Sequence, residues 1–155
     1  MILVLRNDKP FAYDVKEDDL THYPSDLGYD FIATGDIKLK MDNDSNYIYP
    51  LDYLDAEQAE IVKKKTASMK RRLREKAGVK FKLGRKNYVV NTDSVSQNKI
   101  ASTLVALKEG LKDKVSWKMQ NGEFVELDAS QFASLAQAVF DYVQDGFSEE
   151  AAAVQ

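Results

Sequence analysis

The sequence predicts an α+β fold with a small N-terminal antiparallel β docking domain at residues 1–50, a basic amphipathic linking helix at 51–78, and a C-terminal α+β domain at 79–155. Short β-like runs separated by turn residues fill the first part. Apolar residues at three- and four-residue spacing mark the second part, and hairpin and helix patterns alternate in the third. The chain is 44% hydrophobic and 30% charged, which is typical of a globular protein with a packed core.

The first 50 residues lack helical periodicity and contain short runs rich in β-branched and aromatic residues. These runs are "ILVL", "FAYDV", "YDFIA", "IKLKM" and "YIY". The segments "RNDKP", "TG" and "DNDSN" separate them and have the composition of turns. We therefore predict a small antiparallel sheet in which each of these runs is a strand.

The next element is a predicted helix from Ala56 to Ala77. Asp55 and Gln58 form a capping box. In this motif the acid accepts a hydrogen bond from a free backbone N–H of the first turn, and the Gln58 side chain accepts one from the backbone N–H of Asp55. Gly78 ends the helix. The apolar side chains form one narrow stripe, which suits a single packing neighbour: Ala59, Val62, Thr66, Met69 and Leu73.

A first hairpin is predicted where "VKFKL" and "KNYVV" flank a Gly-Arg pair. Gly84 can adopt the positive φ that a type II′ turn needs at its first central position. The resulting register places Phe81 opposite Tyr88 and Val79 opposite Val90. All four side chains then share one face of the hairpin.

The second hairpin, "VSWKMQNGEFVEL", is predicted to have a three-residue loop with Gly122 in the left-handed conformation. This register pairs Trp117 with Val125 and Val115 with Leu127, so that both pairs share a face. A two-residue loop would instead place an aromatic side chain opposite a charged one.

Two further helices are predicted in the C-terminal part. The first carries an apolar stripe of Val95, Ile100, Leu104, Leu107 and Leu111. The second follows Asp128, which forms a capping box with Gln131, and Gly146 is expected to end its regular part. Its apolar stripe is Phe132, Leu135, Ala136, Val139, Phe140 and Val143.

The net charge of −3 conceals three blocks: −7 in residues 1–55, +9 in 56–90 and −5 in 91–155. A basic block of this kind can dock on an acidic partner or on another copy of the chain, or pair with the acidic flanks of its own chain. The residues expected to bind a partner are Lys63, Lys64, Lys65, Lys70, Arg71, Arg72 and Arg74. Nucleic-acid binding is a less favoured alternative, because the basic residues surround the helix and no aromatic residues alternate with them.

No catalytic residue, cofactor or metal ion is predicted. The chain has no cysteine, and its single histidine, His22, is far in sequence from Ser94, which is better explained, like Asp93, as a helix N-cap. Asp42 and Asp44 begin a segment that resembles a calcium loop, but a tyrosine occupies the position of the required glycine. A polar turn is the preferred interpretation of this segment, and a weak cation site is an open alternative.

Three blocks in the second half carry a family resemblance: "NTDSVSQNKI", "SWKMQNGEFVELD" and "QFASLAQAVFDYVQDGF". In this order, residues 79–147 resemble a domain family of unassigned function from the tail-fibre gene region of tailed bacteriophages and prophages. Members of this family often follow an N-terminal part like those of tail fibre assembly proteins, which the N-terminal half of this chain does not match clearly. The residues that match the family motif are Thr92, Asp93, Ser96, Gln97, Trp117, Gly122, Val125 and Leu127. The family often has a histidine where this sequence has Asn91, so a role for that histidine does not carry over.

The resemblance implies a non-enzymatic tail protein that acts as an adaptor or fibre-binding protein on the tail fibre or baseplate. An alternative is an assembly chaperone that binds the fibre while it folds. Either protein would be made in the host cytoplasm and would form a homo-oligomer or a heteromeric assembly, and a structural component would remain in the virion tail. No membrane span or secretory signal is predicted, because the apolar run "MILVL" is short and Arg6 follows it directly.

Overall fold

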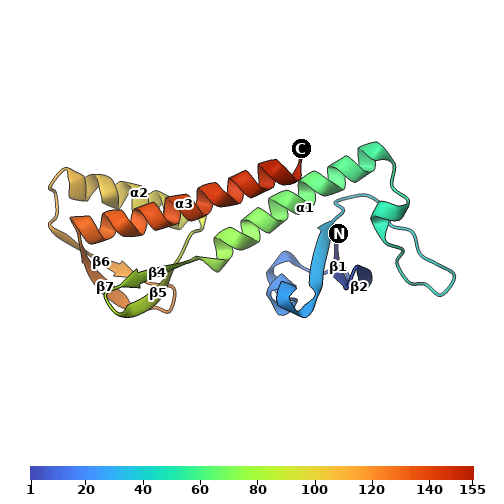
Figure 1. Cartoon of the computed structure of the whole chain (residues 1–155), viewed down its shortest axis with the longest axis horizontal. Helices are drawn as coiled ribbons and strands as arrows, with labels where there is room; N and C mark the ends of the chain where they lie inside the picture. Colours follow the sequence, from blue (N-terminus) through green and yellow to red (C-terminus); the bar gives the residue numbers. More distant parts are fainter. The chain divides into compact units, whose positions relative to one another are not determined.

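A computed structural model describes all 155 residues and has the predicted α+β class (Figure 1). The β-strands are β1 (Ile2–Arg6), β2 (Lys9–Tyr13), β3 (Tyr29–Ala33), β4 (Val79–Leu83), β5 (Lys86–Val90), β6 (Lys114–Lys118) and β7 (Phe124–Asp128). The α-helices are α1 (Ala56–Ala77), α2 (Ser94–Lys108) and α3 (Ala129–Ala153). Short 3₁₀ helices are η1 (Glu17–His22), η2 (Ser25–Leu27) and η3 (Pro50–Asp52). None of the helices combines the length and apolar character that a membrane span requires.

The chain forms two compact units. The first contains Met1–Lys70 and Glu150–Gln155, and the second contains Arg71–Glu149. The division falls within α1 and not at the predicted positions 50 and 78. The reason is that the first part of α1 contributes Val62 to the core of the N-terminal sheet, whereas its last turn bonds to elements of the second unit.

In the first unit, β1 is the middle strand of an antiparallel sheet with the order β2-β1-β3. Alternate side chains of the sheet pack against α1, as period-two alternation requires. The resulting core contains Leu3, Leu5, Ile32, Leu39 and Val62.

The predicted strands "IKLKM" and "YIY" are wrong, because they meet only at an isolated bridge between Met41 and Tyr47. The two runs share a backbone bond from the Ile48 N–H to the Lys40 carbonyl at 3.1 Å, but no regular ladder forms. The Lys40 N–H donates instead to the Tyr53 hydroxyl at 2.9 Å, and in the turn between the runs the Asp44 and Asn46 N–H groups donate to the Asp42 carboxylate at 2.9 and 2.8 Å.

In the second unit, the structure confirms the predicted registers of both hairpins. Phe81 lies opposite Tyr88 in the first hairpin, and Trp117 lies opposite Val125 in the second. Gly122 has a φ of 87°, as the three-residue loop requires. The backbone N–H of Gln120 donates to the Val89 carbonyl at 2.9 Å and thereby joins the two hairpins.

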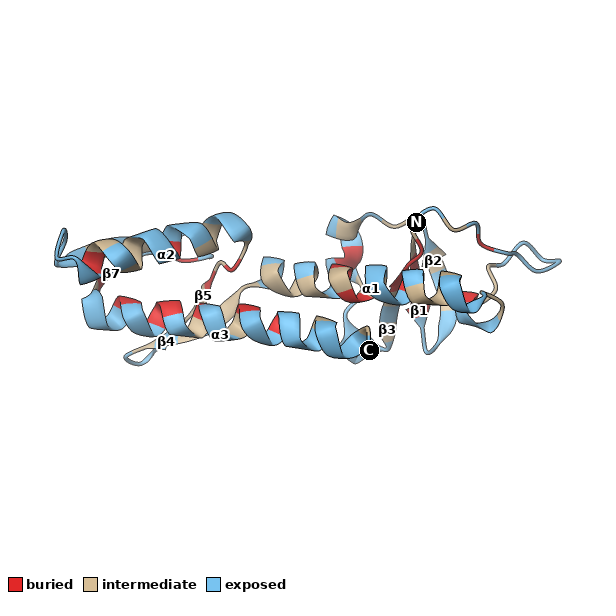
Figure 2. Ribbon diagram, turned by 90° about the horizontal axis from the view of Figure 1, so that it is seen from above, coloured by how far each residue is buried: buried red, intermediate tan, exposed pale blue.

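The helices α2 and α3 cover this pair of hairpins, and Figure 2 shows the buried positions of α3 recurring along one side of the helix. The core of the unit contains Val90, Ile100, Leu107, Met119, Leu127, Phe132, Leu135, Ala136, Val139 and Val143. Both predicted capping boxes are confirmed, with reciprocal bonds between Asp55 and Gln58 and between Asp128 and Gln131. These bonds explain why α1 and α3 begin where the sequence predicts.

Some predicted core positions are wrong. Val95 is 60% exposed because it lies five residues before Ile100, on another face of α2. Leu111 is 73% exposed and follows the end of that helix. Phe140 is 39% exposed, since the buried stripe of α3 is narrower than predicted and passes through the adjacent Val139.

Gly146 does not end α3, which continues to Ala153. Instead it is buried where α3 passes the last turns of α1. A Cβ atom at this position would lie 3.3 Å from Arg74 Cδ and 3.6 Å from Arg71 Cγ. The absence of a side chain therefore allows these two helices to approach closely within the second unit.

The exposure of two α3 side chains predicts different costs of truncation. Leu135→Ala should lower the free energy of unfolding of the second unit by about 2–5 kcal/mol, because it removes a side chain that has no exposed surface. Phe140→Ala should cost about 1 kcal/mol or less, because its side chain is partly exposed. Urea unfolding followed by fluorescence of Trp117, the single tryptophan, measures both. Equal losses would contradict the position of the core.

Candidate functional site

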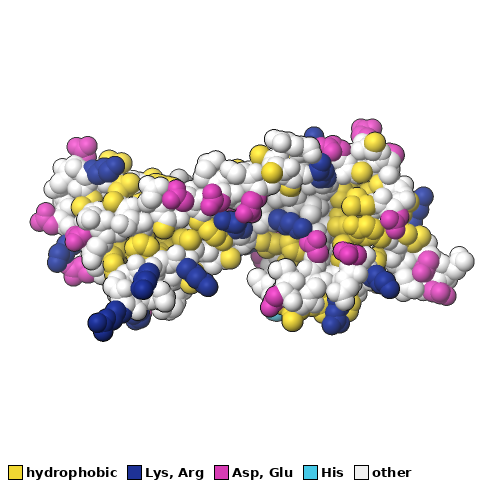
Figure 3. Space-filling view, in the orientation of Figure 1, with side chains coloured by type: hydrophobic (Ala, Val, Ile, Leu, Met, Phe, Trp, Pro, Cys, Tyr) yellow, Lys and Arg dark blue, Asp and Glu magenta, His cyan; other side chains and the backbone are white.

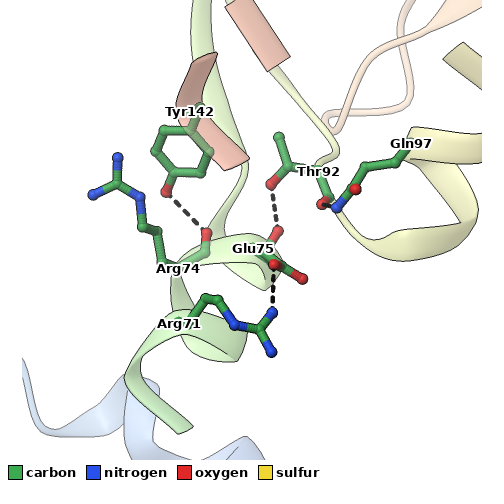
Figure 4. A network of polar contacts seen from close by, with 6 residues as sticks. All are labelled: Arg71, Arg74, Glu75, Thr92, Gln97 and Tyr142. Carbon is green, nitrogen blue, oxygen red and sulfur yellow. Dashed lines mark hydrogen bonds and ion pairs between the residues drawn. The ribbon is translucent and has the colours of Figure 1, made fainter. Parts of the chain in front are cut away.

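The C-terminal end of α1 is held by side chains from three other segments of the second unit, and Figure 4 shows two of them, Thr92 and Tyr142. An α-helix leaves its last four carbonyl groups without partners in the helix. The Tyr142 hydroxyl donates to the Arg74 carbonyl at 2.8 Å, and the Gln120 side-chain amide donates to the Ala77 carbonyl at 3.1 Å. The Thr92 hydroxyl donates to the Glu75 carbonyl. We call these side chains, Thr92, Gln120 and Tyr142, the carbonyl collar.

The family motif Thr-Asp-x-x-Ser-Gln forms the corner between β5 and α2. Thr92 is fully buried, and its carbonyl accepts from the Gln97 side chain at 2.7 Å (Figure 4). Asp93 is the N-cap of α2, since its carboxylate accepts from the Ser96 N–H at 3.0 Å and from the Ser96 hydroxyl at 2.7 Å. These two bonds hold the pKa of the Asp93 carboxyl below its ordinary value. The motif therefore acts as a structural corner.

The other motif residues belong to the hairpin β6–β7 and its contact with α3. Trp117 packs edge-to-face against Phe132, with ring centroids 5.1 Å apart. Gly122 provides the turn, and Leu127 is fully buried. Val125 lies opposite Trp117 in the hairpin. All of these positions stabilise the fold of the second unit.

Two of the arginines predicted to bind a partner are used within the second unit. The Arg71 guanidinium lies 2.6 Å from the Glu75 carboxylate and 4.4 Å from the centre of the Phe147 ring. The Arg74 guanidinium lies 3.0 Å from the Glu149 carboxylate and is positioned over the Tyr142 ring. Burial raises the pKa of the Tyr142 phenol, which therefore stays a hydrogen-bond donor.

The predicted lysines lie in the first unit, and most of them have internal partners. Lys70 lies 2.7 Å from the Asp30 carboxylate, and Lys63 donates to the main-chain oxygen of Gln155 at 2.8 Å. Lys64 lies 3.8 Å from Glu60, and the aliphatic part of Lys65 lies against Gly35. The remaining predicted residue, Arg72, is exposed in the second unit. The seven basic residues are thus divided between the two units.

An apolar groove that sequence reasoning missed runs along the first part of α1 in the first unit. Its volume is about 400 Å³, and Figure 3 shows hydrophobic side chains gathered beside this part of the helix. We call it the α1 groove, and it is lined by Leu5, Asp8, Asp30, Phe31, Ile32, Tyr49, Leu51, Ala56, Ala59, Glu60, Val62, Lys63, Thr66, Ala67, Lys70 and Ala153. Its wall is apolar and its border carries both charge signs.

Tyr49 is a polar side chain of the groove lining with a shifted pKa. Burial raises the pKa of its phenol, and the nearby carboxylates of Asp8, Asp30 and Asp52 raise it further. The phenol is therefore an O–H donor that faces an acidic border. The sequence signal for this site is the apolar segment "YIYPLDYL", whose pattern predicts a strand followed by a domain boundary instead of a groove.

The segment that resembles a calcium loop forms a polar turn. The Asp42 carboxylate accepts from the N–H groups of Asp44 and Asn46 and from the Asn46 side chain, and the Asn46 N–H is the main cause of its lowered pKa. No group of three or more metal-ligating side chains gathers in the structure. His22 lies at the exposed end of η1.

Residues 56–155 match the family described as Domain of unknown function (DUF4376), and this range contains the three helices and both hairpins of the second half. No curated protein and no solved structure matches the chain.

The carbonyl collar predicts a specific cost for loss of one hydroxyl. Thr92→Val keeps the shape of the fully buried side chain but leaves the partly buried Glu75 carbonyl without this donor, which should lower the free energy of unfolding by about 1–3 kcal/mol. Thr92→Ser keeps the hydroxyl, so its free energy of unfolding should fall less than that of Thr92→Val. Urea unfolding of the two variants measures the difference, and equal stability of Thr92→Val and the wild type would contradict the role of this bond.

The N-cap of α2 predicts a pH dependence. Because the pKa of Asp93 is lower in the folded state than its ordinary value of 3.8, the charged carboxylate stabilises the second unit above that pH. This contribution is lost as the pH falls through the folded-state pKa. Asp93→Asn still caps the helix but does not titrate, so its free energy of unfolding should fall less between about pH 5 and pH 2.

Ser96→Ala should also reduce this pH dependence, because it removes the hydroxyl that lowers the pKa of Asp93 most. Ser134→Ala is the matched control, since its hydroxyl bonds only to a helix carbonyl, that of Ser130. Unfolding curves collected across the acidic range test the prediction. If the free energy of unfolding falls equally with pH in Asp93→Asn and in the wild type, Asp93 is not the source of the pH dependence.

Proposed function

This chain belongs to the DUF4376 family, and we propose that it is a non-enzymatic structural protein of a bacteriophage tail. In this role it is an adaptor that binds a tail-fibre or baseplate protein and remains in the virion. The resemblance of residues 79–147 to a family from tail-fibre gene regions supports the phage context. The α1 groove supports the binding role, and it is the observation on which the proposal depends.

The α1 groove has the properties of a surface that binds a protein segment. Its apolar wall includes Leu51, which is 49% exposed, and partly buried Phe31 and Tyr49. Open apolar surface with a polar border is typical of sites of protein interaction. The border offers Lys63 and Asp8, so a partner segment can be oriented by charge as well as held by apolar contact.

The hydrogen bonds of the polar motif residues support a structural role for the motif over a catalytic one. The Thr92 hydroxyl, the Asp93 carboxylate and the Gln97 amide are all engaged in helix capping or backbone hydrogen bonds. Groups that a reaction would need as base, nucleophile or oxyanion donor must be able to reach a substrate. These groups instead stabilise the corner between β5 and α2.

The second candidate function is an assembly chaperone that binds a fibre protein while it folds. The α1 groove favours it as well, because an incompletely folded fibre exposes apolar segments that can occupy such a groove. The two functions differ in whether the chain stays in the finished particle. Both require a partner with an apolar segment.

Nucleic-acid binding is the weakest candidate. Lys70, Arg71 and Arg74 form ion pairs with carboxylates of the chain, which reduces the positive charge available to phosphates. The acidic blocks on either side of residues 56–90 also repel a polyanion. Retention of mixed-sequence duplex DNA at low salt, with release at higher salt, would favour this candidate over the other two.

Co-purification with the tail-fibre protein encoded nearby tests the binding role. Leu51→Lys places a charge in the α1 groove and should weaken partner binding by about tenfold or more. Leu27→Lys is the matched control, because Leu27 is 61% exposed in the same unit and does not line the groove. If both variants bind the partner as the wild type does, the groove is not the binding site.

Mass analysis of purified particles separates the two leading functions. A virion component should be present in a fixed ratio to the fibre or baseplate protein. Absence of the chain from particles, together with binding to the fibre protein during assembly, would establish the chaperone instead.

A further inference from the structure

A second surface of the first unit combines aromatic rings with an arginine. Phe11, Tyr23 and Tyr29 contact one another edge-to-face, with ring centroids 5.4 to 6.5 Å apart. The Arg6 guanidinium carbon lies 5.3 Å from the Tyr29 ring centre and 5.9 Å from the Phe11 ring centre. We call these four residues the aromatic–arginine patch. It is exposed, since Phe11 alone keeps 53% of its surface open to solvent.

The sheet positions these side chains. Arg6 is on the middle strand β1 and lies directly opposite Tyr29 on β3. On the other side, Phe11 is the extra residue of a β-bulge, because its neighbours Pro10 and Ala12 pair with consecutive residues of β1. A bulge re-aims the side chain that it contains. In this way the sheet brings a ring from each outer strand to the arginine of the middle strand.

The cations of this surface have no anionic partner within the chain. Arg6 is exposed and contacts the two rings, but it forms no ion pair or side-chain hydrogen bond. The neighbouring Lys9 is also exposed and also forms no ion pair or side-chain hydrogen bond. Arg6 and Lys9 border a surface depression of about 350 Å³ together with Asn7, Pro10 and Phe11. Contact with the rings orients a guanidinium while its N–H donors stay available.

We infer that the aromatic–arginine patch binds an acidic segment of a protein partner, in which a carboxylate side chain lies next to an aromatic or apolar one. A guanidinium offers a planar pair of donors that matches a carboxylate, and the exposed Phe11 ring offers apolar contact beside it. Tyrosine and arginine are also the residue types that contribute most to protein interfaces. This inference is independent of the proposed function and concerns a surface other than the α1 groove.

The local charge favours carboxylates over a polyphosphate. Arg6 and Lys9 lie in a block, residues 1–55, whose net charge is −7. Two cations can pair with one or two carboxylates at short range. A nucleic acid would extend over the acidic surroundings and meet repulsion there. Complementarity is therefore confined to the patch and its border.

A fluorescence anisotropy titration of the full chain tests the inference. The probe is a short fluorescein-labelled peptide with Glu-Phe-Glu between glycine-serine flanks, and the comparison peptide has Gln-Phe-Gln. The acidic peptide should bind about tenfold or more tightly than the neutral one, and added salt should weaken its binding. Equal binding of the two peptides would overturn the inference.

Matched variants locate the site on the chain. Arg6→Gln and Phe11→Ser should each raise the Kd of the acidic peptide by about tenfold or more. Tyr13→Ser is the control, because Tyr13 is 59% exposed on the same strand as Phe11 and contacts Tyr47 instead of the patch. It should change the Kd by less than about twofold. Wild-type affinity in both patch variants would overturn the assignment.

Two further measurements keep the result interpretable. Far-UV circular dichroism verifies that the variants are folded. If Phe11→Ser does not fold, the affinity of Arg6→Gln alone tests the assignment, because Arg6 is exposed and its replacement should leave the fold intact. Labelled oligothymidylate is titrated in parallel. Tighter binding of oligothymidylate than of the acidic peptide, lost in Arg6→Gln, would overturn the protein partner in favour of single-stranded nucleic acid.

Discussion

The termination of α1 is the constraint on which the second unit depends. Three of the four carbonyl groups that the helix leaves open at Arg74–Ala77 accept from the carbonyl collar. Its donors come from the corner before α2, from the turn of the second hairpin, and from α3. The bonds to the Arg74 and Glu75 carbonyls are partly buried, where a carbonyl without a partner is costly, so they favour the meeting of these elements at one place. The close approach at Gly146 and the backbone bond between the two hairpins lie at the same end of α1.

Several side chains of the basic block form ion pairs with side chains of the acidic blocks. Lys70 pairs with Asp30 from the acidic N-terminal block, and Arg74 pairs with Glu149 from the acidic C-terminal block. Lys86 binds Glu123 across the two hairpins, and this bond raises the pKa of the lysine and lowers that of the glutamate. Much of the basic block thus stabilises contacts within each unit. The surfaces that we propose for a partner are the apolar α1 groove and the aromatic–arginine patch.

Sequence reasoning predicted the features that depend on local chemistry. The capping boxes at Asp55 and Asp128 located the starts of α1 and α3, and the turn residues Gly84 and Gly122 determined the registers of both hairpins. It failed where a neighbouring element decides the outcome. The apolar run "IKLKM" did not become a strand because its backbone found partners in the loop, and Phe140 stayed exposed because the neighbours of α3 cover a narrower stripe.

The amino-acid order is therefore sufficient for the fold class, the starts of α1 and α3 and the registers of both hairpins, since each start and each register depends on residues a few positions apart. The two proposed binding surfaces depend on tertiary structure. The α1 groove joins residues from β1, β3, η3 and α1, and the aromatic–arginine patch joins Arg6, Phe11, Tyr23 and Tyr29 across three strands and a turn. Contacts between distant segments arise only when the sheet and helices pack, because no local pattern encodes which exposed side chains become neighbours.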